Sequence, residues 1–152
     1  MWITKKDLSI TLNYFRSMNN EKNPSLAHLI GCVEEFHNAF RIPVRKSPTG
    51  LLEEREYTLR FNLMKEENEE YLEAAQNGDI VEIADALGDM LYILCGTMNA
   101  HGLHDQMGEI FAEIQRSNMS KLDDNGQPIY REDGKVMKSS NYFKPNIAKF
   151  LK

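Results

Sequence analysis

The stretch from Leu63 to Gly96 constrains this chain most, because it carries acids where a helix of a globular protein is normally apolar. It predicts two helices joined at the Asn-Gly-Asp sequence of residues 77–79. At about 100° per residue, the first helix places Glu67 and Glu70 on its inward, apolar arc. An acidic pair on that arc needs a chemical explanation.

The second helix also carries acids on one face. Glu82, Asp85 and Asp89 lie within about 60° of one another, because positions i, i+3 and i+7 share a helix face. From Ile83 to Ala100 the only charged side chains are those of Asp85 and Asp89. We therefore expect this helix to be buried on nearly all sides.

A buried ionised carboxylate must be paired, protonated or bound to a metal. No Lys or Arg occurs between Lys65 and Arg116, so pairing within the stretch is impossible. Inward carboxylates on two adjacent helices, without a local cation, are what a hard divalent metal site in a helical bundle requires. We assign Glu67, Glu70, Asp85 and Asp89 to such a site. For Glu69, Glu73, Glu109 and Glu113 we favour the other interpretation, an acidic face in solvent.

Length and charge narrow the class of protein. A chain of 152 residues predicts a single domain over 1–152, with a core at about 25–120 and a tail at 121–152. The net charge of -5 argues against a nucleic-acid or membrane-surface partner. We expect a cytoplasmic protein, since no signal peptide or membrane-spanning run is recognisable. Cys32 and Cys95 lie in apolar helical contexts and are expected to be reduced.

Apolar spacing predicts more helices before this stretch. The first is a helix or helical arm from Thr4 to Met18. The next has Asn23 as its N-cap and Pro24 as its first residue. The long acidic helix is expected to open at Leu51. For the helices of the central stretch we expect Gly78 to end the first, Asp79 to cap the second and Gly102 to end it.

The last third of the chain changes in character. A helix from Asp105 to Met119 is predicted to present Met107, Ile110, Phe111 and Ile114 on one face. Beyond Ser120, the turn signal Asp133-Gly134 predicts a small β-hairpin or an irregular flap. Basic residues gather here: Arg116, Lys121, Arg131, Lys135, Lys138 and Lys144. An anionic ligand would find its positive partners in this tail.

Taken in order, these motifs resemble a known family. Residues 66–70 read EExxE, and residues 85–92 follow after a loop as Asp-Ala-Leu-Gly-Asp-Met-Leu-Tyr. This resembles the all-α nucleoside triphosphate pyrophosphohydrolase superfamily, the MazG-like group, and within it the phosphoribosyl-ATP pyrophosphohydrolase-like branch. Three stretches support that branch: Glu35-Phe36-His37 with Phe40 and Pro43, residues 116–122, and residues 133–142.

The resemblance implies an all-α fold of the four-helix-bundle type that dimerises, with Mg²⁺ or Mn²⁺ held by ExxE and ExxD carboxylates. By motif, Glu67 and Glu70 match ExxE. The second motif departs from the pattern, because aligning Asp89 puts Ala86 where a glutamate should stand. Either Asp85 replaces that glutamate, or the literal ExxD is Glu82-Ile83-Ala84-Asp85. We favour Asp85 and Asp89, with Glu82 as a third ligand or a supporting residue.

The resulting hypothesis is an enzyme that hydrolyses a (deoxy)nucleoside triphosphate to monophosphate and pyrophosphate, with dUTP-like nucleotides as the leading candidates. Glu66 is assigned as the base that accepts the proton of water. Outer phosphates are assigned to Arg116, Lys121, Lys135 and Lys138, and the nucleoside to Phe36, His37, Phe40 and Asn118. The many apolar helix faces predict a homodimer or larger homo-oligomer, with the cleft shared between subunits.

Two other interpretations remain open. A carboxylate-bridged di-iron bundle also uses inward glutamates, but it needs Glu-x-x-His pairs, and no histidine lies between Glu66 and Ala100. A non-catalytic helical module that binds a metal or a nucleotide would explain the amphipathic helices. It would not explain two uncompensated acids in the most apolar helix.

Overall fold

The computed structural model describes residues 24–151, which are built from helices. They are α2 (Leu26–Ala39), α3 (Glu54–Asn77), α4 (Ile80–His101), α5 (Met107–Met119) and the short 3-10 helix η1 (Ile147–Phe150). The predicted all-α class is confirmed. The helix predicted from Thr4 to Met18 lies outside the described residues. Within 24–151, no helix is both long enough and apolar enough to cross a membrane.

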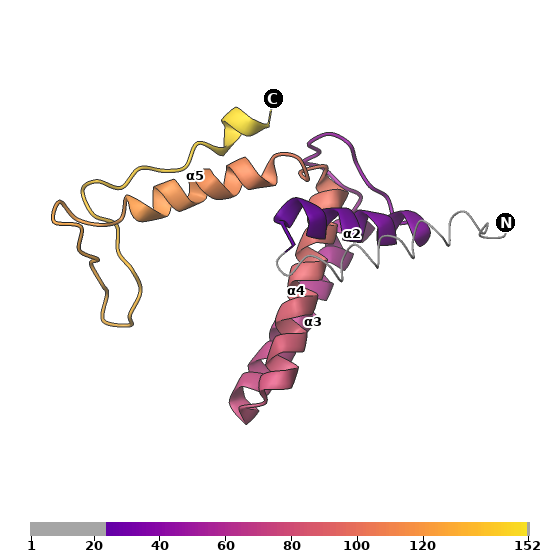
Figure 1. Cartoon of the computed structure of the whole chain (residues 1–152), viewed down its shortest axis with the longest axis horizontal. Helices are drawn as coiled ribbons and strands as arrows, with labels where there is room; N and C mark the ends of the chain where they lie inside the picture. The colour runs from indigo at the N-terminus through magenta and orange to yellow at the C-terminus, as the bar shows by residue number, and fades with distance from the viewer. Residues whose placement is uncertain (1–23, 152) are drawn as a thin grey trace.

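α3 and α4 form an antiparallel hairpin, which α2 crosses near the C-terminal end of α4 (Figure 1). The turn between them is made by Gly78, whose φ of 69° is left-handed and therefore suits a residue without a Cβ. Asp79 caps α4, and its side chain accepts hydrogen bonds from the amides of Val81 (3.0 Å) and Glu82 (3.3 Å). Both predicted boundaries are confirmed.

Two helix starts differ from the predicted ones. α2 begins at Leu26, where the side chain of Ser25 accepts a hydrogen bond from the amide of His28 (3.2 Å). The predicted cap, Asn23, lies outside the described residues, and Pro24 is not helical. α3 begins at Glu54 rather than Leu51, since a capping box of Glu53 and Glu56 starts it. In both cases a side-chain cap a few residues downstream sets the first turn.

The core lies where α2 crosses α4. Its buried side chains are Ile30, Val33, Cys95 and Met98, with Leu26, Leu29 and Met107 packed against them. Asn99 is fully buried and donates from its Nδ2 to the carbonyl of Ile30 (3.1 Å), which ties the two helices together. Neither Cys32 nor Cys95 forms a disulfide within residues 24–151. This core covers only the C-terminal half of α4.

The N-terminal half of α4 is exposed, so the prediction that this helix is buried on nearly all sides is wrong for the single chain. Ile80, Ala84, Leu87, Leu91 and Leu94 recur at spacings of four and three residues and form one apolar surface, the α4 stripe. Ile80 is 73% exposed and Leu87 is 50% exposed. α2 reaches the stripe at Leu91, which lines a small cavity with Leu29 and Val33. α5 turns away from the hairpin (Figure 1), and most of the stripe stays exposed among the described residues.

α5 extends away from the hairpin, and the tail doubles back along it to end in η1 (Figure 1). The buried face of α5 consists of Ile110, Glu113 and Ser117. Of the predicted face, Ile110 is buried and Met107 packs against the core, but Phe111 is 66% exposed and Ile114 is 40% exposed. The tail covers Glu113 and Ser117 instead. The Ser117 hydroxyl donates to the carbonyl of Phe143 (2.8 Å), which fixes the tail there.

The predicted turn at Asp133-Gly134 forms, but the segment around it does not pair into a regular β-hairpin. Gly134 has a φ of 83°, and the amide of Arg131 donates to the carbonyl of Lys135 (2.9 Å). Among the described residues, β pairing is limited to a single bridge between Tyr130 and Val136. Of the two predicted forms, the structure therefore has the irregular flap.

Candidate active site

Acids of α3 and α4 face one another in the hairpin. The negative charges that act on Glu67 come from Glu70 and Glu66 on its own helix and from Asp89 and Asp85 on α4. Burial first, and then these charges, raise the pKa of the half-buried Glu67 carboxyl above its ordinary value. The structure thus places four of the five predicted ligands, and the predicted base, within reach of one another's charge. Glu82 lies one turn before Asp85, near the start of α4.

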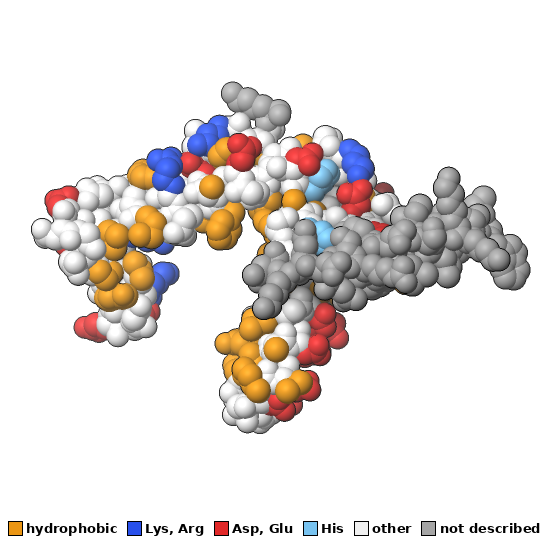
Figure 2. Space-filling model, viewed as in Figure 1, with side chains coloured by type: hydrophobic (Ala, Val, Ile, Leu, Met, Phe, Trp, Pro, Cys, Tyr) orange, Lys and Arg blue, Asp and Glu red, His pale blue; other side chains and the backbone are white. Residues whose placement is uncertain are grey.

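These acids are more exposed than predicted. Glu66, Glu70, Glu82, Asp85 and Asp89 are all exposed, and only Glu67 is half-buried. The reason is the uncovered N-terminal half of α4. In Figure 2, acidic side chains gather on one side of this end of the hairpin and hydrophobic ones on the other.

The donor set suits a hard divalent cation, although it is not closed. No three Asp, Glu, His or Cys side chains within residues 24–151 converge closely enough to enclose a metal ion. The groups that face Glu67 are carboxylates alone, the oxygen ligands that Mg²⁺ and Mn²⁺ prefer. All the charges that raise its pKa are negative, so a bound cation would offset their repulsion. The residues present fit the metal in chemistry, and their role as ligands stays a prediction.

An aromatic cluster adjoins the acids. The rings of Phe36 and Phe40 lie 4.4 Å apart between centroids, and Tyr92 meets Phe36 edge-on at 5.8 Å. Tyr92 follows Asp89 by three residues and so shares its helix face. Phe40 is 67% exposed and offers a free ring face to a planar ligand such as a nucleobase. Sequence reasoning missed Tyr92, although its spacing from Asp89 was the available signal.

His37 does not offer a surface to a ligand. Its side chain is 2% exposed, and a Cβ placed on Gly96 would lie 2.9 Å from its Nε2. Burial and the nearby Arg60 lower the pKa of this imidazole, which favours the neutral ring. In the structure His37 supports the crossing of α2 over α4, and the direct contact with the nucleoside that the sequence predicted is not available.

The predicted phosphate-binding cations lie on α5 and the tail. They already have partners: Arg116 pairs with Glu113 at 2.9 Å and stacks over Phe143, Lys121 donates to Asn118 at 2.8 Å, and Lys138 lies over Tyr142. Lys135 is exposed. Because α5 runs away from the hairpin (Figure 1), the structure does not bring these cations to the acids of the same chain.

The prediction that Glu113 belongs to an acidic face in solvent is wrong, because its side chain is 4% exposed. Arg116, Lys149 (3.0 Å) and the backbone amide of Asn146 (2.8 Å) all donate to its carboxylate. These hydrogen bonds, that of Arg116 first, lower the pKa of Glu113 to about 2. The tail covers this glutamate, a long-range contact that helical periodicity cannot reveal.

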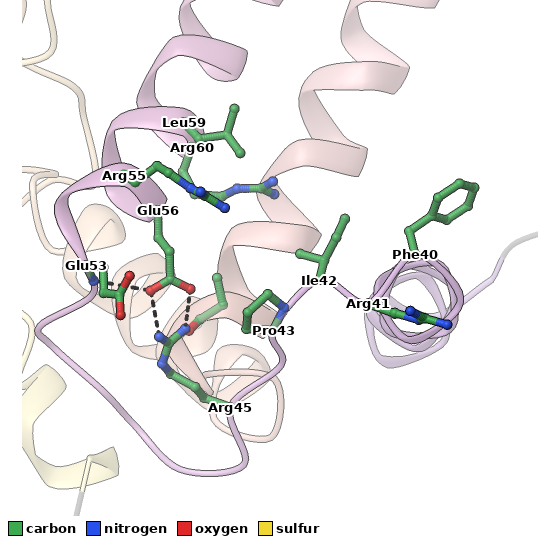
Figure 3. Close-up of a pocket in the computed structure, with 11 residues that line it drawn as sticks. Phe40, Arg41, Ile42, Pro43, Arg45, Glu53, Arg55, Glu56, Leu59 and Arg60 are labelled. Carbon is green, nitrogen blue, oxygen red and sulfur yellow. Dashed lines mark hydrogen bonds and ion pairs between the residues drawn. The ribbon is translucent and has the colours of Figure 1, made fainter. Parts of the chain in front are cut away.

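Sequence reasoning also missed an arginine-rich pocket of about 460 Å³ between the α2–α3 loop and the first turns of α3 (Figure 3). Four arginines line it, Arg41, Arg45, Arg55 and Arg60, together with two glutamates, Glu53 and Glu56. The available signal was the spacing of Arg60, seven residues before Glu67 and therefore on the same face of α3.

Comparison with known proteins places these features in a family. Residues 33–118, more than half of the chain, match the family described as phosphoribosyl-ATP pyrophosphohydrolase. The matched range contains the facing acids, the aromatic cluster and the arginine-rich pocket. No curated protein matches the chain at a significant level. Membership indicates a pyrophosphohydrolase that acts on a nucleotide. The chain belongs to the phosphoribosyl-ATP pyrophosphohydrolase family, within the all-α, MazG-like nucleoside triphosphate pyrophosphohydrolases.

Proposed function

We propose that this chain hydrolyses a nucleoside triphosphate to its monophosphate and pyrophosphate in a reaction that depends on Mg²⁺ or Mn²⁺. The observation that carries the proposal is the environment of Glu67. Its half-buried carboxyl lies near four other acids, and burial first, then their charges, raise its pKa. Such repulsion opposes folding of the hairpin, and a divalent cation would turn it into attraction.

The carboxylates would have two roles, as metal ligands and as the base. Glu67, Glu70, Asp85 and Asp89 would hold the metal, with Glu82 as a third ligand on α4 or a supporting residue. A divalent ion bound there supplies charge neutralisation of the phosphates and a lower pKa for a coordinated water. Glu66 is exposed beside Glu67, and we assign it to accept the proton of the attacking water.

The bond that breaks joins the α-phosphorus to the oxygen that bridges it to the β-phosphate. Water adds to the α-phosphorus, its proton passes to Glu66, and pyrophosphate leaves with the bridging oxygen. A γ-phosphatase would instead be expected to use a P-loop, and this sequence has no GxxxxGK[ST] motif. The supported products are therefore nucleoside monophosphate and pyrophosphate.

The nucleoside is assigned to the aromatic cluster. Phe36, Phe40 and Tyr92 would stack with the base, next to acids that hold the phosphates through the metal. We propose a dUTP-like pyrimidine nucleotide as substrate. A hydrolysis screen over ribo- and deoxynucleoside triphosphates, with Mg²⁺ or Mn²⁺, tests it: preference for a purine nucleotide would reject this choice of base.

We further propose that the working unit contains at least two chains. The α4 stripe is exposed, and apolar surfaces of this kind commonly mark interfaces. The tail cations also lie away from the acids of their own chain (Figure 1). A second copy packed on the stripe would bury it, and would bring Asn118 and Lys121 of one chain toward the acids of the other.

Asp89→Asn tests the metal assignment. We expect turnover to fall by at least about 100-fold, more than removal of a residue that only supports a ligand, with the fold intact as judged by circular dichroism. Pyrophosphate and monophosphate are measured by chromatography. Glu73→Gln, an exposed acid of α3, is the matched control and should stay near wild type. Near-normal turnover in the Asp89 variant, or release of diphosphate and orthophosphate by wild type, would contradict the proposal.

A further inference from the structure

The two cysteines of the chain meet at one cavity. Cys32 on α2 and Cys95 on α4 both line a cavity of about 130 Å³ between these helices, and the rest of its lining is Gly88, the ring of Tyr92 and aliphatic side chains. The chain has no other cysteine. Any disulfide formed within one chain would therefore join these two residues.

Two contacts hold the helices together on either side of the thiols. On one side, the carbonyl of Ile30 accepts a hydrogen bond from Nδ2 of Asn99 (3.1 Å). On the other, the ring of Phe36 meets the ring of Tyr92 edge-on, with the centroids 5.8 Å apart. Along each helix, the cysteine lies between the two residues that make these contacts. Both thiols are therefore at the same part of the helix crossing.

The two thiols differ in their access to solvent. Cys95 is 1% exposed, whereas Cys32 is half-buried. Burial, and then the charge of Cys32, raise the pKa of the Cys95 thiol, so that a charge on one sulfur acts on the other. An oxidant reacts with an accessible thiolate and hardly with a buried, protonated thiol. Cys32 is therefore the cysteine that an oxidant in solution reaches first.

The cavity gives the two cysteines room to approach each other. Protein interiors are packed about as densely as organic crystals, so a void leaves the groups around it without contacts on one side. A Cβ built on Gly88 would meet no atom within 4 Å, so α4 presents open backbone to this space. Movement of α2 toward α4 would fill the void. It would also bring the two cysteines toward the Cα separation of roughly 4.4–6.8 Å that a disulfide needs.

We propose that Cys32 and Cys95 form a site of reversible oxidative modification, at which a peroxide converts the two thiols into an intramolecular disulfide. The Cys32 thiolate attacks one oxygen of hydrogen peroxide and the O–O bond breaks, which leaves a sulfenic acid on Cys32. The other oxygen leaves as hydroxide and takes up the proton that the thiol released. Cys95 then attacks the sulfur of the sulfenic acid, the S–O bond breaks, and hydroxide leaves with the proton of Cys95 as water. The cysteines together lose two electrons, and the peroxide gains them.

The disulfide would also act on the nucleoside site, a consequence that rests on the proposed function. Phe36 follows Cys32 by about one turn of α2, and Tyr92 precedes Cys95 by about one turn of α4. Contraction of the crossing beside these rings would displace the contact against which the base is proposed to stack. The oxidised enzyme should therefore have a higher KM for its nucleotide than the reduced enzyme.

Peptide mapping tests the modification itself and needs no activity. The full-length protein is treated with hydrogen peroxide, the remaining thiols are alkylated with N-ethylmaleimide, and the peptides are analysed by mass spectrometry. Cys32 should be linked to Cys95, neither should carry the label, and dithiothreitol should restore both thiols. Two labelled cysteines, a sulfinic acid at Cys32 beside a labelled Cys95, or a disulfide between chains would each overturn the proposal.

Thermal melts test whether the disulfide fits the fold. A crosslink that closes the long loop between α2 and α4 should raise the Tm of the oxidised wild type by roughly 5 °C or more. Cys32→Ser is the matched control, and the same peroxide treatment should not raise its Tm. Cys95→Ala covers the case in which the serine variant does not fold, and it should also show no gain. A lower Tm for the disulfide form would show that the helices cannot approach, and would overturn the geometry.

Kinetics test the consequence for the nucleoside site. The KM of the oxidised wild type should rise severalfold above that of the reduced enzyme and return with dithiothreitol. Cys32→Ser should have the same KM before and after peroxide. An unchanged KM in the oxidised wild type would overturn the link between the disulfide and the aromatic cluster. If the reduced enzyme hydrolysed no nucleotide, the proposed function would fail, and the peptide map would still decide the modification.

Discussion

Two glutamates on different parts of the molecule lie in opposite electrostatic environments. Glu113 on α5 is buried and receives hydrogen bonds from Arg116, Lys149 and the amide of Asn146, which lower its pKa to about 2. Glu67 on α3 is half-buried and lies near other carboxylates; burial first, and then these charges, raise its pKa. The first glutamate holds the tail on α5. The second experiences repulsion, and no cation of the described residues is among the groups that shift its pKa.

The same contrast separates covered from uncovered apolar surface. Where α2 crosses α4, the side chains of Ile30, Val33 and Cys95 are at most 3% exposed. About one turn toward the start of α4, Leu91 is 41% exposed, and about one turn further Leu87 is 50% exposed. Uncompensated charge and uncovered apolar surface therefore occur on the same half of the hairpin. A part of the molecule that is incomplete in both respects is where substrate, metal and a second chain would bind.

Leu91→Glu should have the largest effect on this contrast. A carboxylate in the centre of the α4 stripe would be buried against leucines in a dimer, at a cost of about 3 kcal/mol or more, so the dissociation constant should rise at least about 100-fold. Light scattering and sedimentation at micromolar concentration measure it. Turnover should fall with the population of dimer.

Leu51→Glu is the matched control, because Leu51 is 87% exposed in the loop before α3. It should leave the mass unchanged. A wild-type mass near 17.6 kDa, that of one chain, would contradict the dimer directly.

Glu113→Gln should release the tail from α5 while the hairpin stays folded. The neutral amide keeps some hydrogen bonds but loses the attraction to Arg116 and Lys149. Hydrogen exchange at the amide of Asn146 should accelerate on the order of tenfold. Glu109→Gln, one turn earlier and exposed, should leave that rate unchanged.

The pH dependence of the tail contact has a definite sign. The pKa of Glu113 is lowered in the folded state from 4.5 to about 2, so its stabilisation is complete above pH 4.5 and is lost as pH falls toward 2. Exchange at Asn146 in wild type should therefore approach that of the variant only in acid. Equal rates at neutral pH would show that Glu113 does not hold the tail.

Local chemistry made part of this fold predictable from sequence. The turn at Gly78, the cap at Asp79 and the orientation of Glu67 toward Asp89 follow from backbone preferences and from a period of 3.6 residues. Each depends on neighbours within one or two turns. The predicted starts of α2 and α3 were less accurate, because several nearby side chains compete to cap a helix.

Contacts between distant segments were not predictable in this way. Burial of α4 depends on which elements cover it, and its composition alone does not reveal that α2 crosses at one end. Glu113 and Lys149 are 36 residues apart, so no helical period connects them. Arg60 precedes Lys65 in the sequence, and the space that its guanidinium occupies is left by Gly96 on the next helix, a relation that no local pattern reveals.

Glu67→Gln should have the smallest effect and the most informative one. Without metal, the folded state raises the pKa of this carboxyl, so the unfolded chain ionises first, at about 4.5. As pH rises above that value, ionisation stabilises the unfolded state relative to the folded one. The free energy of unfolding of wild type should therefore fall until the folded carboxyl also ionises. The glutamine variant has no such charge. At neutral pH with EDTA it should be more stable than wild type by a few tenths to about 1 kcal/mol, a value limited by solvent screening, and the two should be equally stable below pH 4.

Added Mn²⁺ should reverse the order, because a ligand that binds only the folded wild type stabilises it by mass action. Thermal melts at several pH values measure both effects, with Glu73→Gln as the control that shows neither. A variant less stable than wild type in EDTA at neutral pH would mean that Glu67 has a cationic partner after all, and the contrast with Glu113 would disappear.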